Sequence, residues 1–264
     1  MPKLALRAIA CVLLICAPFV ARADAPASIF LEDLTSPELA ARIRAGATTV
    51  IIPVGGTEQN GAHMALGKHN VRVRLLSERI ARALGNAVVA PVIAYVPEGS
   101  VNPPAGHMRY PGSITVAPDV YRAVVESAAR SLKLAGFRDI VVLGDSGDYQ
   151  KDNATVAAKL DKEWAATPVR VHAVNEYYRA ATSEFFDSLR RQGFKEGEIG
   201  PHAGLADTSL MLAVDPRLVR ADRMQKSDGV TGDPQRATAQ LGQGAADVIV
   251  LQTVAAIQAA TQRR

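Results

Sequence analysis

The sequence predicts an α/β protein, a three-layer α/β/α sandwich whose mainly parallel sheet is covered by helices on both faces. Two observations carry this prediction. Short β-branched, apolar runs, such as 48–54 and 139–143, alternate with longer segments whose apolar residues recur at helical spacing. Because strands that alternate with helices form βαβ units, these strands are expected to be parallel. The ligand site of such a sheet lies beyond the carboxyl ends of its strands.

Each predicted element has a start or stop signal. A helix begins at Ser36-Pro37-Glu38, where serine suits the cap and proline the first helical position, and Gly46 ends it. Asn70 is the predicted cap of a helix over about 71–84, which Gly85 ends. The other predicted elements are strands at 48–54, 87–94, 139–143 and 169–174, and helices near 118–135, 151–166, 175–191 and from about 234.

The first 23 residues are expected to be a secretory signal peptide rather than part of the fold. A basic start precedes an apolar run at 8–20, and small residues at 21–23 suit a signal peptidase. Both cysteines, Cys11 and Cys16, lie in this segment, so the remaining sequence offers neither a disulfide nor a thiolate ligand. We therefore expect a periplasmic or secreted protein.

The remainder, 24–264, has the size of a single domain and is nearly neutral. Three of the 30 basic residues lie in the predicted signal peptide, which leaves 27 against 26 acidic residues, a net charge of +1 instead of +4. The sequence has no basic patch with interleaved aromatic residues, and nucleic acid is therefore not an expected partner. No later segment reads as a membrane helix, so no membrane partner is expected after signal cleavage.

Polar side chains follow the predicted strand at 48–54. Glu58, His63 and His69 lie in the loop between this strand and the next helix. A carboxylate and two imidazoles at a strand end suit a metal site or an acid/base site. The alternative is that the histidines cap helices or bind buried carbonyl groups.

Two further loops bring comparable residues. Asp145, Ser146 and Asp148 follow the strand at 139–143, so this loop is expected to share a crevice with the first one. Two carboxylates near another carboxylate and a histidine suit a divalent cation, although Asp145 alone is better explained as part of a polar turn. His202 precedes a predicted helix whose cap is Asp207, a position that suits proton transfer.

A long segment rich in glycine and proline, 95–113, is expected to be a functional loop because it is too long for a simple connection. His107 lies in it and is expected to face the crevice. By contrast, His172 lies within a predicted strand and Trp164 on a predicted helix face, so both are expected to be structural.

Taken together, these segments resemble the motifs of the creatininase family (creatinine amidohydrolase and relatives). The first match is Pro53–His69, which is similar to the family's P-x-G-x-x-E-Q-H-G-P-H-L-P-L-x-x-D. The later matches, in the expected order, are His107 with Tyr110–Thr115, His202–Ser209 and Gly229–Pro234. An ordered set over most of the chain is far more specific than any one motif.

The resemblance implies a layered α/β sandwich that assembles as a homo-oligomer, such as a hexamer. It also implies metal-dependent hydrolysis of C–N bonds in cyclic or linear amides. Family members use two metal ions, commonly Zn or Mn, to activate a bridging water, and the histidine that corresponds to His202 relays a proton.

Three metal-binding positions of the family are changed here. Asn60 and Ser146 replace histidine ligands, and His69 stands in place of the aspartate that bridges the two ions. Because neutral imidazole cannot bridge two cations as a carboxylate does, we expect one Zn or Mn ion per chain. The expected ligands are Glu58, His69, Asp148 and Asp207.

The expected reaction is attack of a metal-activated water on the carbonyl of a small-molecule amide. Glu58 and His202 are the expected catalytic residues, with His202 carrying the proton to the leaving nitrogen. The residues expected to contact the substrate are Asn60, His63, His107 and Ser146. The motifs do not single out creatinine among amides.

Two alternatives remain open from the sequence. The loss of three metal-binding residues is also typical of a periplasmic small-molecule-binding pseudoenzyme that has kept the crevice without the chemistry. Gly144-Asp145-Ser146 resembles the motif of metal-free serine hydrolases, with Ser146 as nucleophile. Against this second alternative, the motif lies mid-chain and no Asp-x-x-His follows it.

Overall fold

A four-stranded parallel sheet forms the centre of the fold. The computed structural model describes residues 28–262, so the predicted signal peptide lies outside the described residues. The strands are β1 (Thr49–Val54), β2 (Ala87–Val89), β3 (Asp139–Gly144) and β4 (Arg170–Ala173), in the order β2-β1-β3-β4. All three strand pairs are parallel, as the βαβ pattern predicted.

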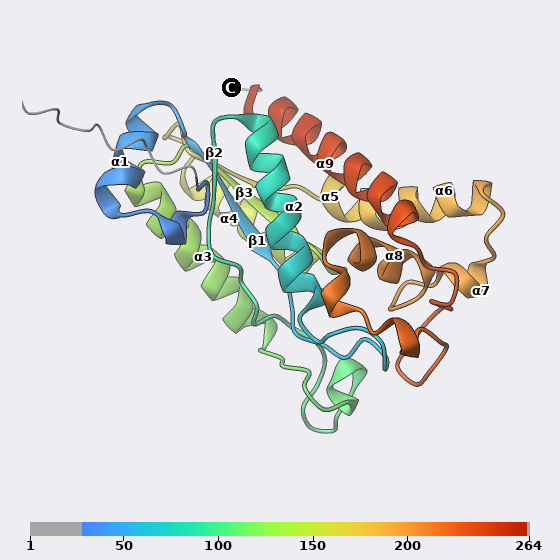
Figure 1. The fold of residues 1–264 in the computed structure, drawn as a ribbon. Helices are drawn as coiled ribbons and strands as arrows, with labels where there is room; N and C mark the ends of the chain where they lie inside the picture. The colour runs from blue at the N-terminus through green and yellow to red at the C-terminus, as the bar shows by residue number, and fades with distance from the viewer. Residues whose placement is uncertain (1–27, 263–264) are drawn as a thin grey trace, which may run out of the picture.

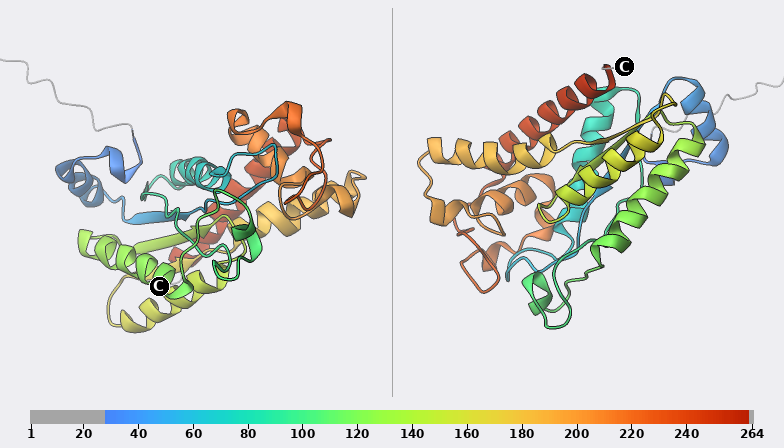
Figure 2. Two further views of the ribbon diagram at one scale, coloured as in Figure 1. Left: turned by 90° about the horizontal axis from the view of Figure 1, so that it is seen from below. Right: turned by 180° about the vertical axis from the view of Figure 1, so that it is seen from behind.

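Helices cover both faces of this sheet, which confirms the predicted sandwich (Figures 1 and 2). α3 (Pro118–Ala135) and α4 (Gln150–Glu163) pack against one face. α2 (Lys68–Leu84) and α9 (Ala239–Gln262) lie on the other. Since successive side chains of a strand point to opposite faces, Ile51 enters the core under α2 and α9, while Val50 and Ile52 enter the core under α3 and α4.

The remaining elements are short. They are η1 (Leu31–Asp33), α1 (Ser36–Arg44), η2 (Gly106–Arg109), α5 (Glu176–Arg179), the π-helical turn η3 (Ala180–Glu184), α6 (Phe185–Arg191), α7 (Glu196–Ile199), α8 (Leu205–Val214), η4 (Pro216–Leu218) and η5 (Ala221–Arg223). The helix predicted near 175–191 is therefore one continuous helical segment with a π-turn inside it. β2 is shorter than the predicted strand 87–94, because Pro91 has no N–H to continue the ladder.

The start of α2 differs from the prediction and changes the site. The helix begins at Lys68, so Asn70 lies inside its first turn instead of capping it. The side-chain Oδ1 of Asn70 accepts a hydrogen bond from the backbone N–H of Gly56 at 2.9 Å. This bond ties the loop after β1 to the helix, and it brings Lys68 and His69 into helical geometry at the strand ends.

α9 is one exception to the expectation that no later segment resembles a membrane helix. Within residues 28–262, this helix is long and apolar enough to cross a membrane by length and composition. In the fold, however, it packs Ala245, Ala246, Ile249 and Ile257 into the core beside α2 and α8. Figure 1 shows it lying along the same face of the sheet as α2.

Candidate active site

A cavity of about 210 Å³ opens beyond the carboxyl ends of β1 and β3. The loops after both strands contribute to its wall, as expected for loops that share a crevice at the carboxyl edge of a parallel sheet. Its ionisable lining comes from these loops, from the N-terminal parts of α2 and α8, from η2 and from the segment before α8. These residues include Glu58, Lys68, His69, Arg72, His107, Asp145, Asp148, His202 and Asp207.

Two buried cations of α2 connect the carboxylates of the cavity floor. Lys68 Nζ lies 3.4 Å from Glu58 Oε1 and also contacts Asp207 Oδ2. Arg72 holds Asp207 with Nη1, which lies 2.5 Å from Oδ1, and Asp145 with Nε, which lies 2.9 Å from Oδ2. Both cations lie on the inner face of α2 because they are four residues apart.

His69 completes this arrangement between two carboxylates. Its Nε2 lies 2.8 Å from Glu58 Oε1, and its Nδ1 lies 2.5 Å from Asp145 Oδ2. Both ring nitrogens therefore face acceptors, which favours a doubly protonated ring. Burial and the charge of Lys68 oppose that state, but the two carboxylates outweigh them and raise the pKa of His69.

The three carboxylates of the cavity floor are held in their ionised form. Burial by itself would raise the pKa of Glu58, but the charges of His69 and Lys68 hold it well below its usual range. The charges of Lys68 and Arg72 likewise lower the pKa of Asp207 against the effect of burial. We name the six residues Glu58, Lys68, His69, Arg72, Asp145 and Asp207 the ionic floor. Its three acidic and three basic groups balance.

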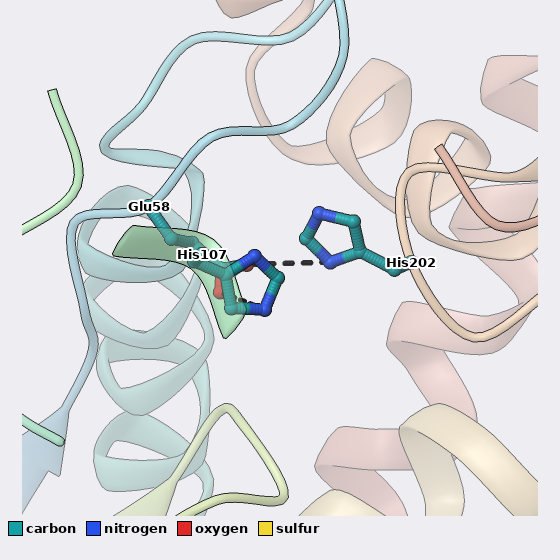
Figure 3. Close-up of side chains that lie close together, drawn as sticks. All are labelled: Glu58, His107 and His202. Atoms are coloured by element: carbon teal, nitrogen blue, oxygen red, sulfur yellow. Dashed lines mark ion pairs between the residues drawn. The ribbon is translucent and has the colours of Figure 1, made fainter. Parts of the chain in front are cut away.

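Glu58 also faces two histidines from other parts of the chain (Figure 3). His107 Nε2 lies 3.1 Å from Glu58 Oε2, and His202 Nδ1 lies 3.5 Å from Glu58 Oε1. The ring centroids of the two histidines are 4.5 Å apart. One ligand atom from each of the three residues lies within 4.8 Å of the others, so the three together could hold a metal ion.

The hydrogen bonds of His202 set its tautomer. Its Nε2 lies 2.9 Å from the carbonyl oxygen of Gln59 and donates to it. The lone pair of Nδ1 therefore faces Glu58 and the cavity. Burial, with the charge of Lys68, lowers the pKa of His202 to about 4, so the ring is neutral near pH 7 and can accept a proton.

Residues 32–257 match the creatininase family (creatinine amidohydrolase). The chain belongs to the creatininase family. This confirms the resemblance predicted from the motifs, and it makes the chain a member of a family of hydrolases with the metal-dependent amidohydrolase fold.

Three comparisons show how far this creatininase-family likeness extends. The chain is 27% identical over 215 residues to a creatinine amidohydrolase of Pseudomonas putida, covering 78% of this chain and 80% of the relative. It is 25% identical over 236 residues to a mycofactocin precursor peptide peptidase of Mycobacterium ulcerans, covering 74% and 78%. A solved structure of a manganese creatininase superposes with a TM-score of 0.71 at 25% identity, covering 88% of this chain and 98% of that one.

Two metal ions do not fit the ionic floor of this creatininase-family chain. Lys68 and Arg72 already neutralise Asp207, and His69 uses both ring nitrogens on carboxylates. A second cation placed among these charges would meet their repulsion without a free ligand. Possible ligand atoms converge instead in two groups that share His107: Glu58, His107 and His202, and Glu98, His107 and Asp148.

The structure places the residues of the predicted ligand set in two different surroundings. Glu58, His69 and Asp207 lie together in the ionic floor, where His69 and Asp207 are engaged with charged partners. Asp148 is exposed at the cavity rim, where its carboxylate lies within 4.8 Å of ligand atoms of Glu98 and His107. The ligand assignment of His69 and Asp207 stays a prediction.

The residues predicted to contact the substrate also divide. His107 and Ser146 line the cavity, and their contact with a substrate stays a prediction. Asn60 is buried outside the lining, and its Nδ2 donates to the carbonyl oxygen of Glu58 at 2.9 Å. His63 is also buried, with Nε2 2.9 Å from Thr208 Oγ1. Substrate binding by Asn60 and His63 stays a prediction.

Sequence reasoning missed Lys68, Arg72 and Glu98, and it assigned Asp145 to a polar turn. Asp145 is instead buried and receives hydrogen bonds from Arg72 and from the Tyr177 hydroxyl, at 2.6 Å for the latter. The spacing of Lys68 and Arg72 on one helix face was a usable signal. This signal could be used only if the helix was known to begin at Lys68, because the predicted helix from residue 71 leaves Lys68 in the loop.

Proposed function

We propose that this chain hydrolyses a C–N bond in a small linear or cyclic amide, using one divalent ion, Zn or Mn. The observation that carries the proposal is the convergence of Glu58, His107 and His202 at one cavity in a creatininase-family fold. The known relatives named above act on creatinine and on a precursor peptide, so amide chemistry is common to both.

The cavity favours a small substrate. Its volume of about 210 Å³ is below the several hundred Å³ usual for drug-sized ligands. Tyr178, Ala181, Phe186 and Leu210 add apolar or aromatic side chains to the cavity lining, beside the charged groups of the ionic floor. A substrate of a few heavy atoms, with an apolar edge and one polar amide, matches these two surfaces.

The residues have separate roles in this proposal. A bound ion would lower the pKa of a coordinated water towards about 7, which makes it a nucleophile. Glu58 is ionised at neutral pH, so its carboxylate would hold the positively charged ion at the cavity. His202, neutral and with Nδ1 facing the cavity, accepts the proton of the attacking water and returns it to the leaving nitrogen.

The ionic floor also favours a second candidate function, binding without turnover. Because its charges balance without an ion, the floor could persist in a protein that has lost the reaction. The serine hydrolase alternative gains no such support. Within residues 28–262, no hydrogen bond joins the Ser146 hydroxyl to a histidine, as a nucleophile would need.

An amide screen separates these functions. The full chain, reconstituted with Zn or Mn, is incubated with small cyclic and linear amides, and release of ammonia or amine is measured. The expected result is turnover that falls about 10²- to 10⁴-fold in His202→Gln, the usual contribution of a general acid–base residue. Saturable binding of the same amides with no release of product would instead establish the binding protein.

Two further features are proposals of the same kind. The predicted signal peptide supports action in the periplasm or outside the cell, which cell fractionation tests. The family resemblance supports a homo-oligomer, and light scattering of the purified protein measures it.

A further inference from the structure

Glu98 is a buried acid whose position is fixed by the loop that follows β2. Its backbone N–H donates to Thr115 Oγ1 at 2.9 Å, and Val96 pairs with Thr115 in an isolated bridge. Gly56 packs directly against the carboxylate of Glu98, so a side chain at this glycine would collide with it. The loop therefore places the carboxylate beside the segment that carries Glu58.

The carboxylate of Glu98 lacks the partners that other buried acids of the site have. Glu98 is 1% exposed, and neither Oε1 nor Oε2 has a hydrogen-bond partner among residues 28–262. By contrast, Asp145 and Asp207 each receive several hydrogen bonds. A buried polar group without a partner costs stability and calls for an explanation, such as a missing ion.

Two potential ligands face this unpartnered acid. One ligand atom each from Glu98, His107 and Asp148 lies within 4.8 Å of the others. The three residues come from the loop after β2, from η2 and from the loop after β3. Asp148 is exposed at the rim, so an ion can reach the cluster from solvent.

The cluster lies on the side of Glu58 away from the internal cations. Lys68 and His69 contact Oε1 of Glu58, whereas His107 faces Oε2. Glu98 lies close to the carboxylate of Glu58, and among residues 28–262 no cationic side chain donates a hydrogen bond to it. A divalent cation at this cluster would place positive charge against both carboxylates.

We infer that Glu98, His107 and Asp148 bind a divalent cation, with Glu58 beside it. Two carboxylates and an imidazole form a mixed oxygen and nitrogen set that suits Mn²⁺, with Zn²⁺ as a competitor. The role of this ion in hydrolysis rests on the proposed function, whereas its position is inferred from the contacts of Glu98, His107 and Asp148 alone. This position leaves His202 free to carry protons, because the cation lies on the Glu98 side of His107.

Mn²⁺ binding tests this assignment without reference to activity. The full chain is stripped with chelator, and Mn²⁺ is titrated while free Mn²⁺ is followed by electron paramagnetic resonance. The wild type should bind about one ion per chain. Glu98→Gln, which keeps size and shape, should weaken binding at least tenfold, as should Asp148→Asn. Glu32→Gln, an exposed matched substitution, should leave binding unchanged.

His202→Gln distinguishes the two possible sides of Glu58. If the cation lies on the Glu98 side, this variant keeps Mn²⁺ affinity within about threefold of the wild type. Loss of binding in His202→Gln with retention in Glu98→Gln would overturn the inference, as would absence of binding in the wild type. Asp148 is exposed, so its variant is a second test if Glu98→Gln does not fold. Mn²⁺ binding without amide turnover would retain the site and reject the proposed function.

Discussion

The Nζ of Lys68 lies 3.4 Å from Oε1 of Glu58, and both side chains are almost completely buried. The same ammonium group contacts Asp207 of α8, so a single lysine lies between an acid of the loop after β1 and an acid of a distant helix. The solved structures of the family include a manganese creatininase. In this chain, part of the positive charge beside the acids of the site comes from a lysine side chain.

Lys68→Met should therefore destabilise the folded chain and make its stability depend on added metal. Removal of one partner from a buried ion pair costs about 3–5 kcal/mol, because the remaining charges lose their compensation. We expect this loss in urea unfolding with chelator, and partial recovery when Zn²⁺ or Mn²⁺ is added. Lys226→Met, at an exposed position, is the matched control. Equal stability of Lys68→Met and the control would contradict the role given to Lys68.

Arg72→Lys should destabilise the chain although it keeps the positive charge, because that charge alone does not hold both Asp145 and Asp207. Arg72 holds Asp145 and Asp207 with different guanidinium nitrogens, and a lysine cannot reproduce that fork. We expect a loss of about 2–3 kcal/mol in the free energy of unfolding, measured by urea titration. Unchanged stability would mean that one point charge serves both acids.

His202 should make stability depend on pH in a defined window. The folded chain lowers the pKa of His202 from 6.5 to about 4, so between these values the unfolded chain binds the additional proton. Stability therefore rises with pH across the window and is lost as the pH falls. Relative to His202→Gln, the wild type should lose about 1–3 kcal/mol between pH 6.5 and pH 4.5. Parallel stability curves for the two proteins would argue against a neutral, buried His202.

Glu98 should have the opposite pH effect in the metal-free chain. Its pKa is raised from 4.5 to about 10, so the folded chain keeps a proton that the unfolded chain releases above pH 4.5. The wild type consequently loses stability as the pH rises through this range. At pH 8 with chelator, Glu98→Gln should be about 1–2 kcal/mol more stable than the wild type. Calorimetry at pH 5 and pH 8 measures the difference, and a less stable variant at pH 8 would refute the prediction.

The sheet and its covering helices could be predicted because their signals are local. The run at 49–54 is mostly β-branched and apolar, and β3 repeats this pattern, so period and length suffice to predict both strands. The proximity of Glu58 and Asp145 also follows from the predicted βαβ order, since the two residues follow parallel strands that end at the same edge of the sheet. The proximity of His202 followed from the family motifs rather than from periodicity.

The ionic floor could not be predicted, because tertiary contacts override local preference there. Asparagine is a good helix cap, and Asn70 was assigned that role, yet its bond to Gly56 draws it into the helix. Lysine and arginine are usually solvent-exposed, and the burial of Lys68 and Arg72 is favourable only because acids from other parts of the chain pair with them. Glu98 is the only acidic residue of segment 95–113, but nothing in that sequence indicates that its side chain is buried.

The first turn of α2 carries Lys68 and His69 at the end of a helix where the backbone dipole disfavours positive charge. Its compensation comes from Glu58, Asp145 and Asp207, which lie in three separate stretches of the chain. A nascent chain that has not yet reached residue 207 lacks one of these acids. The helix start, and with it the cavity, should therefore become stable only late in synthesis, so that the last third of the chain decides when the site closes.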